Sequence, residues 1–324
     1  MQKSEEGYGS GKPRVGISTC LLGEPVRFDG GHKRDRYITD TLGKYFDWVP
    51  VCPEVECGLT VPRESMHLEG EVQAPRLITG QSRVDHTERM SSWAKKRLRD
   101  LENEDLCGFI FKSNSPSSGM ERVRIYDAKG IPHKAGTGIF ARAFMEHFPL
   151  LPVEEEGRLC DPHLRENFIE RIFCLRRYRT FLTTDGTVRG LVNFHTDHKM
   201  LLLAHNPHLY REMGKLVAHA KEYKREELIK QYQELMLRTL KTKATVKKNA
   251  NVLLHMMGFL KTHLTSDEKQ EMLGIIENYK RELIPLIVPV TLMQHYVRKY
   301  GEPYLERQYY LNPHPIELQL RNHA

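Results

Sequence analysis

The chain has 324 residues, of which 40% are apolar and 28% charged, and its formal net charge is +7. This is the composition of a soluble protein with room for two domains, and no apolar run approaches the length of a membrane span. Six cysteines in so long a chain do not form a disulfide framework, so we expect core residues, metal ligands or catalytic thiols. The positive charge is compatible with a nucleic-acid partner without proving one.

The first 14 residues are polar and glycine-rich and contain no apolar signal region. We therefore expect a disordered lead-in, a cytoplasmic protein and no membrane partner. Beyond it, apolar runs and helical spacing alternate up to about residue 155. Strands are predicted at 14–20, 47–51, 106–111 and 123–126, short strands within 69–82, and helices at 36–46, 87–102 and 139–148. This alternation predicts an α/β fold, with a parallel-sheet, Rossmann-like N-terminal domain over residues 13–155.

The composition changes after Pro152. Residues 154–157 (EEEG) read as a charged connector, and helical spacing then dominates. Helices are predicted at 163–183, 188–204, 208–220, 249–264, 268–284 and 286–300. Residues 160–305 are therefore predicted to form an all-α helical C-terminal domain, followed by a polar C-terminal tail over 306–324.

Three predicted strands end in loops that carry reactive side chains. Cys20 follows the first strand, and Cys52 opens the segment VCPEVECGLTVPRE, which also holds Glu54 and Cys57. The strand at 106–111 ends in Lys112 and a serine-rich loop. Strand ends followed by Gly, Pro and Ser loops are where α/β proteins place their chemistry, so we expect the functional site there.

These segments resemble a known family. Cys20 in STCLLG, Cys52 in the segment above and the loop KSNSPSSG (112–119) are similar to the motifs of the thiouracil desulfidase family. The stretch FHTDHKMLLLAHNP (194–207) resembles a helical domain of unknown function that is often fused to it. The fused form resembles bacterial desulfidases that act on 4-thiouridine in tRNA. The resemblance covers nearly the whole chain.

The resemblance implies a 4Fe-4S cluster as cofactor, held by three cysteines with the fourth iron open. An open iron is a soft acceptor for the sulfur of a thiocarbonyl, so that water can replace this sulfur at carbon. The implied activity is a non-redox desulfidase that converts thiolated uracil to uridine and sulfide. A nearby carboxylate would handle the proton of the attacking water, and Glu54 is the candidate.

One position departs from the family pattern. The third family cysteine lies in an SPSCG loop, and this chain has Ser118 there. Because clusters select thiolates, we expect the third ligand to be Cys57, with an altered cluster or no cluster as alternatives. Cys20 and Cys52 themselves could be small core residues. The other three cysteines lie on apolar patterns and are predicted to be buried thiols: Cys107, Cys160 and Cys174.

Several polar residues admit both a structural and a functional interpretation. Glu54 could pair with Arg63 or cap a helix instead of transferring a proton. Lys112 and Ser115 could contact the substrate or could be ordinary loop groups. The glycines of 136–138 precede a helix and could hold a phosphate, although a plain tight turn is favoured.

The helical half contains two candidate binding features. Three histidines and one aspartate invite a metal interpretation: His195, Asp197, His198 and His205. Structural or capping roles are favoured for the histidines, because no clear third ligand of matching geometry is evident. The run 221–248 has nine Lys or Arg against four Asp or Glu, which suits either tRNA binding or a solvated face.

The resemblance favours a tRNA desulfidase, and two rival functions remain. One is a desulfidase of free thiouracil or its nucleotide, and the other is a non-enzymatic interaction protein. The oligomeric state is not predicted.

Overall fold

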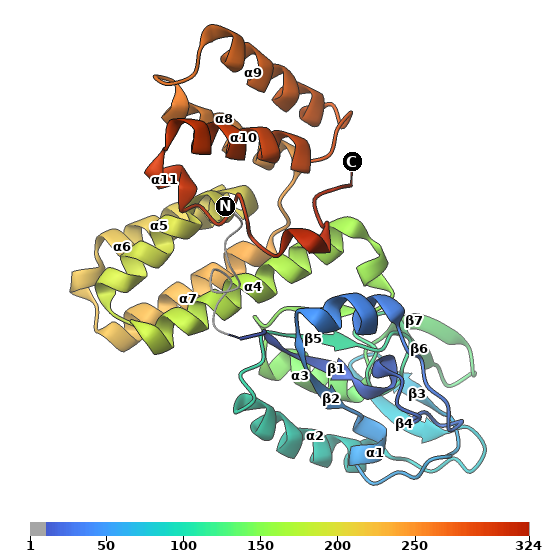
Figure 1. The fold of residues 1–324 in the computed structure, drawn as a ribbon. Helices are drawn as coiled ribbons and strands as arrows, with labels where there is room; N and C mark the ends of the chain where they lie inside the picture. Colours follow the sequence, from blue (N-terminus) through green and yellow to red (C-terminus); the bar gives the residue numbers. More distant parts are fainter. Residues whose placement is uncertain (1–10, 324) are drawn as a thin grey trace. The chain divides into compact units, whose positions relative to one another are not determined.

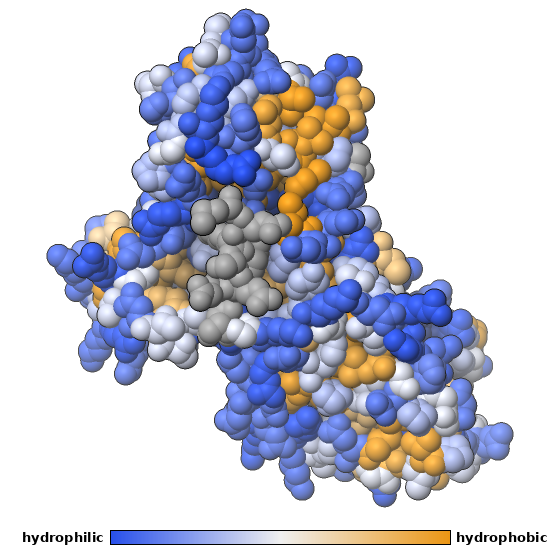
Figure 2. Space-filling model, viewed as in Figure 1, coloured by the Kyte–Doolittle hydropathy of each residue, from blue (hydrophilic) through white to orange (hydrophobic). Residues whose placement is uncertain are grey.

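The computed structural model describes residues 11–323, which divide into two compact units (Figure 1). One unit is Gly11–Leu164, and the other runs from Arg165 to the end of the described chain. The expectation for residues 1–10 lies outside the described residues. No described helix is long and apolar enough to cross a membrane. Figure 2 shows that hydrophilic residues cover most of the visible surface.

A four-stranded parallel sheet forms the first unit's centre, as the α/β prediction requires. Its strand order is β2 (Asp47–Val51), β1 (Arg14–Ser18), β5 (Gly108–Phe111) and β8 (Val153–Glu155). The chain passes from β2 on one side of β1 to β5 on the other. The carboxyl ends of β1 and β5 therefore flank a topological switch point, where open α/β sheets bind their ligands.

The strand β8 corrects the prediction of a charged connector after Pro152. Glu154 and Glu155 are buried, yet both carboxylates have partners. Glu154 Oε2 accepts from Arg158 Nε at 2.7 Å, and Glu155 Oε1 accepts from the Met120 N–H at 2.6 Å. Because these contacts satisfy the charges, an acidic segment can form the edge of the sheet.

A second sheet was not predicted as a separate unit. Its order is β4 (Ala74–Thr79), β3 (Met66–Glu71), β6 (Val123–Tyr126) and β7 (Pro132–Gly136), and its pairing is mixed. The strand expected at 123–126 exists, but it pairs with β3 and β7 and does not extend the parallel sheet. Two of the three pairings are antiparallel, and strand periodicity alone does not reveal the relative orientation of paired strands.

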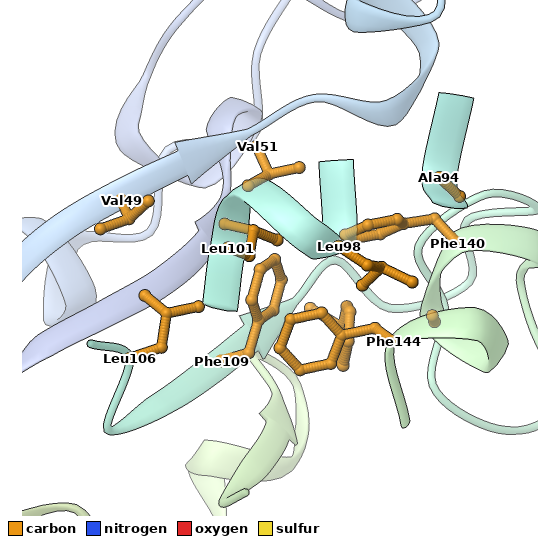
Figure 3. Close-up of a cluster of buried hydrophobic side chains, with 11 residues drawn as sticks. Val49, Val51, Ala94, Leu98, Leu101, Leu106, Phe109, Phe140 and Phe144 are labelled. Atoms are coloured by element: carbon orange, nitrogen blue, oxygen red, sulfur yellow. The ribbon is translucent and has the colours of Figure 1, made fainter. Parts of the chain in front are cut away.

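Helices α2 (Thr87–Glu102) and α3 (Ile139–His147) pack on the parallel sheet and enclose an apolar core (Figure 3). Phe109 lies at its centre with Phe140 and Phe144 around it. A Cβ atom on Gly16 of β1 would lie 2.2 Å from the Phe109 ring, so only glycine fits there. The helix predicted at 36–46 is instead a π-helical turn (Tyr37–Thr41) followed by a 3₁₀ turn (Leu42–Lys44).

The second unit is helical, as predicted. Thr265 caps α9 in a capping box with Glu268. Short 3₁₀ turns lie at Ala220–Glu222 and Ile316–Leu318 in this unit, and another lies at Arg158–Cys160 near the end of the first unit. The helices are α4 (Pro162–Thr184), α5 (Val188–His205), α6 (Pro207–Ala218), α7 (Arg225–Lys241), α8 (Val246–Leu260), α9 (Ser266–Lys280), α10 (Ile287–Tyr300) and α11 (Pro303–Glu306).

The segment 306–324, predicted to be a polar tail, packs into this unit over its described residues. Gln308 and Tyr310 are fully buried, and Arg321 is 4% exposed. The Arg321 guanidinium donates to Glu166 at 3.1 Å and to Glu170 at 2.7 Å, both on α4. This buried ion network holds the end of the chain against α4.

Candidate active site at the carboxyl edge of the parallel sheet

A cavity of about 220 Å³ lies at the carboxyl ends of the parallel strands. Cys20 follows β1, Cys52 follows β2 and Lys112 follows β5, and all three line the cavity. The Lys112 N–H donates to Ser18 Oγ at 2.9 Å and ties the ends of β1 and β5 together. The parallel sheet thus brings together side chains from positions far apart in the sequence.

The two cavity thiols, Cys20 and Cys52, are half-buried and close enough to influence each other electrostatically. Burial raises the pKa of Cys20 to about 11, against the opposing charges of Lys112 and Arg27. Burial also raises the pKa of Cys52. Both groups are therefore protonated at neutral pH in the metal-free site, and binding a metal would displace their protons.

Ser118 lies in a tight turn that forms another wall of the cavity. Ser115 Oγ accepts from the N–H groups of Ser117 at 3.3 Å and Ser118 at 3.1 Å, and Ser115 O accepts from the Gly119 N–H at 2.8 Å. Ser118 is 4% exposed. The family's third cysteine position therefore faces the same cavity as Cys20 and Cys52.

Cys57 does not belong to the lining of this cavity, contrary to the expected convergence of three cysteines. Its side chain packs against the core of the second sheet, which includes Leu68, and its thiol donates to Glu54 O at 3.3 Å. The reason lies in the short helix α1 (Pro53–Glu56), which Cys52 and Cys57 flank. Five helical positions correspond to a rotation of about 140° around the axis, so the two thiols leave it in different directions.

Glu54 lines the cavity and has two partners there. One carboxylate oxygen pairs with the Arg63 guanidinium, and Oε1 accepts from Ser117 Oγ at 2.9 Å. Arg63 also donates to Val26 O at 3.1 Å, so it joins the two loops that flank the site. The structural pairing of Glu54 with Arg63 is therefore present, and it holds the carboxylate in place at the cavity.

Lys112 pairs with Glu156, the residue after β8, and its ammonium donates to Ser113 O at 3.0 Å. Its charge lowers the pKa of Cys20 relative to the effect of burial alone. Lys112 and Ser115 both line the cavity, although Ser115 also shapes the turn of Ser118. Glu156 was not predicted as a site residue, because the strand β8 that it directly follows was not predicted either.

Comparison with known proteins matches each half of the chain to a family. Residues 15–156 match the family model for 2-thiouracil desulfurase, and residues 199–315 match the model for the protein of unknown function DUF1722. The chain belongs to the 2-thiouracil desulfurase family, in a form that also carries a DUF1722 domain.

Two relatives illustrate this membership. The uncharacterized protein YbgA of Escherichia coli (strain K12) is 30% identical over 154 residues, a match that covers 47% of this chain and 90% of YbgA. The solved structure of the 4Fe-4S-dependent thiouracil desulfidase TudS is 30% identical in sequence. Its match covers 46% of this chain and 95% of the TudS chain, with a TM-score of 0.38.

The backbone N–H groups that follow the glycine-rich segment 136–138, at the start of α3, already have carbonyl partners and are not free to bind a phosphate. The N–H of Ile139 donates to Pro116 O at 3.1 Å and the N–H of Phe140 donates to Ser117 O at 2.9 Å. A Cβ atom on Gly138 would lie 2.5 Å from the Ser117 carbonyl carbon. These glycines therefore allow the turn of Ser118 to pack on α3, and the phosphate interpretation is wrong.

The cysteines outside the cavity follow the prediction in part. Cys107 and Cys174 are fully buried, and burial raises the pKa of Cys174 to about 11. Cys160 is exposed, contrary to the prediction, because it lies in a 3₁₀ turn and not on a packed strand or helix face.

The histidines of the helical unit turn to different protein partners and do not share one site. His198 Nε2 accepts from Arg177 Nε at 3.0 Å, and His205 Nε2 lies 3.2 Å from Glu170 Oε2. His195 Nδ1 lies 3.1 Å from the Tyr232 hydroxyl. The structural interpretation of all three is therefore the better one.

Among the described residues, one group of side chains in the helical unit has the types and spacing that could hold a metal ion. Ligand atoms of Glu166, Glu170 and His314 lie within 4.8 Å of one another. Arg321 already pairs with both carboxylates, so its positive charge occupies the place that a cation would take. We interpret this group as a structural ion network.

Proposed function

We propose that this protein is an iron–sulfur-dependent desulfidase whose substrate is 4-thiouridine in tRNA. The observation that carries the proposal is the convergence of Cys20, Cys52 and Ser118 on one cavity beside Glu54, at the switch point of a 2-thiouracil desulfurase domain. The related TudS is described as 4Fe-4S-dependent, which supports the same cofactor here. The reaction replaces C=S by C=O, and both protons of the attacking water leave with sulfur as hydrogen sulfide. Carbon keeps its oxidation state, so no oxidant or reductant is needed.

The cavity residues fit a 4Fe-4S cluster at two of three positions. Cys20 and Cys52 would supply thiolates, which soft iron–sulfur clusters prefer. Ser118 would supply an oxygen at the third position, where a thiolate is the usual ligand. When bound, the cluster would supply an open, soft iron that attracts the sulfur of a thiocarbonyl.

The side chains around the cavity would accept the proton of the attacking water and stabilise the negative charge of the Cys20 thiolate. Glu54 can accept a proton from the attacking water, because Arg63 and Ser117 hold its carboxylate at the cavity. Arg27 and Lys112 place positive charge near Cys20, which favours its thiolate form. Lys112 acts from a fixed position, since Glu156 holds its ammonium.

The tRNA substrate is proposed from the basic run 221–248 of the helical unit. Lys241, Lys243 and Lys247 are exposed where α7 ends and α8 begins. Lys248 is instead partly buried, and its ammonium donates to His205 O at 2.7 Å, at the carboxyl end of α5. Exposed lysines of this kind contribute to polyanion binding through counterion release, whereas Lys248 has a structural role.

Anaerobic reconstitution tests the proposal directly. Iron and sulfide content and the visible spectrum would be measured for the full chain, with Cys20→Ala and Cys52→Ala as the variants that should lose the cluster. Product uridine would then be measured from thiolated tRNA, 4-thiouridine nucleotide and free thiouracil.

Each rival function gives a different result in this experiment. Turnover of only the small substrates would make the protein a desulfidase of free thiouracil or its nucleotide. Failure to hold iron, together with no turnover, would leave an interaction protein with a degenerate cluster site.

A further inference from the structure

We propose that a groove between α5 and α6 binds a phosphate group, and that this phosphate belongs to an RNA backbone. The choice of RNA as its source rests on the proposed function; the phosphate site itself does not. The α5–α6 groove is a cavity of about 560 Å³ whose lining lies wholly within the helical unit. Its polar lining includes His195, Lys199, Tyr210, Arg211 and Lys215.

Helical spacing directs the basic side chains to the groove. His195 and Lys199 are four residues apart on α5, and Arg211 and Lys215 are four residues apart on α6. Residues four apart share one face of a helix, and α5 and α6 pack against each other. The two faces therefore present three cations and one imidazole to the same space.

The positive charge of the groove is not neutralised within the described chain. The described lining contains no Asp or Glu, and no ion pair joins its lysines or its arginine to a carboxylate there. Two carboxylates close in sequence pair with histidines and not with the groove's lysines or its arginine. Glu212 pairs with His208 at 3.1 Å, and Glu222 pairs at 2.9 Å with His219, which itself lines the groove. Lys199, Arg211 and Lys215 thus offer three cations without a described carboxylate partner to an anion in the groove.

His195 adds a directed hydrogen-bond donor to this field. Its side chain is 2% exposed, and Nδ1 lies 3.1 Å from the hydroxyl of the buried Tyr232. Burial and the charge of Lys199 lower the pKa of His195 to about 4, so the ring is neutral at pH 7. If the tyrosine hydroxyl donates to Nδ1, the proton of the ring must sit on Nε2.

His195 Nε2 is buried and has no hydrogen-bond partner among the described residues. With the ring proton on Nε2, this N–H is buried without an acceptor, which is unfavourable, and an acceptor oxygen in the groove would satisfy it. A phosphate meets both requirements, since its oxygens only accept hydrogen bonds and its charge complements the cations. The Tyr210 ring lies nearly parallel to the His195 ring, with centroids 6.1 Å apart, and offers a face for stacking of a base.

A carboxylate placed inside the groove gives the sharpest test. Gly214 on α6 lines the groove, and Gly258 on α8 does not. A Cβ atom at either glycine meets nothing within 4 Å, so Gly214→Glu and Gly258→Glu should both fold and change the net charge equally. The triple variant Lys199→Ala, Arg211→Ala and Lys215→Ala removes the cations, and its matched control replaces the exposed Lys261, Arg281 and Arg298.

Binding would be measured on the full chain with an unmodified tRNA transcript, which carries no sulfur, so the result is independent of desulfidase activity. Fluorescence anisotropy at several salt concentrations gives affinity and salt slope, and calorimetry gives binding of uridine 5′-monophosphate. We expect Gly214→Glu and the triple variant to weaken tRNA binding about tenfold or more, and the triple variant to reduce the salt slope by about two to three. Gly258→Glu and the matched control should differ much less.

The outcomes separate the site from its ligand. Loss of nucleotide binding in the groove variants with unchanged tRNA binding would keep the phosphate site but overturn RNA as its source. Equal effects of groove and control variants, or no effect on either ligand, would overturn the site. A desulfidase that turns over free thiouracil yet shows groove-dependent tRNA binding would leave this inference standing while the tRNA part of the proposed reaction fails.

Discussion

Glu54 offers the clearest separation of catalysis from structure. Its side chain is 16% exposed and that of Arg63 is 7% exposed, so their ion pair is largely shielded from water. Glu54→Ala leaves the Arg63 charge without its partner, and we expect this to cost about 3 kcal/mol of unfolding free energy. Glu54→Gln keeps an oxygen for the Ser117 hydroxyl and should cost only about 1–2 kcal/mol.

Glu54→Gln is therefore the variant on which turnover should be measured. We expect it to retain iron and fold while turnover falls about 100-fold, the scale of a lost general acid or base. The assay combines iron determination, chemical denaturation and uridine formation from thiolated tRNA. Glu64→Gln is the control, because Glu64 bonds to Ser82 outside the cavity lining. Unchanged turnover in Glu54→Gln would refute the catalytic role and leave Glu54 as the structural partner of Arg63.

Three further predictions follow from the cavity and the basic run. Ser118→Cys should raise the iron content per chain and slow its loss in air relative to wild type, because it adds a third thiol; Ser118→Ala, measured in parallel, should not. Cys57→Ala should retain the iron of the wild type, since this thiol lies outside the cavity lining, and loss of iron would restore Cys57 as a ligand. Alanine at the exposed lysines should lower the salt slope of tRNA binding by up to about three, and an unchanged slope would make this run an ordinary solvated face. These lysines are Lys241, Lys243 and Lys247.

The bounds of an element could be predicted from the sequence where its own residues show a clear apolar run or helical spacing. The strand at Asp47–Val51 and the helix at Thr87–Glu102 have the predicted bounds, because apolar runs and helical spacing determine them locally. The ends of parallel strands also predicted the location of Cys20, Cys52 and Lys112 on one cavity.

Prediction failed where distant partners decide the structure. The strand β8 is acidic, and only contacts from Arg158 and the Met120 N–H make its burial possible. Cys57 was predicted to be the third cluster ligand only because it is a thiol, whereas the turn of α1 directs this thiol to the core of the second sheet. Neither contact leaves a signature in the local sequence.

The buried ion network of the C-terminal segment also depends on residues far apart in the sequence, and it leads to a further testable prediction. Arg321 lies more than 150 residues from the carboxylates that it contacts, Glu166 and Glu170. Burial alone would raise the pKa of Glu170, but the Arg321 charge and the hydrogen bond from His205 lower it below its usual range. Burial and the neighbouring Glu170 charge raise the pKa of Glu166. The network therefore holds an ionised Glu170 against Arg321 in the folded state.

Replacing Arg321 with Ala should turn the lowered pKa of Glu170 into a raised one, because burial is then no longer opposed by the guanidinium charge. Without the guanidinium, Glu170 can remain buried only by taking up a proton, and this uptake becomes harder as pH rises above the carboxyl's unfolded pKa. We expect the loss of unfolding free energy, relative to wild type, to grow by up to about 1.4 kcal/mol per pH unit between pH 5 and pH 8. Chemical denaturation across this range measures it, with the exposed Arg298→Ala as control. A loss that does not change with pH would mean that Arg321 acts through packing on Tyr310 and not through its charge.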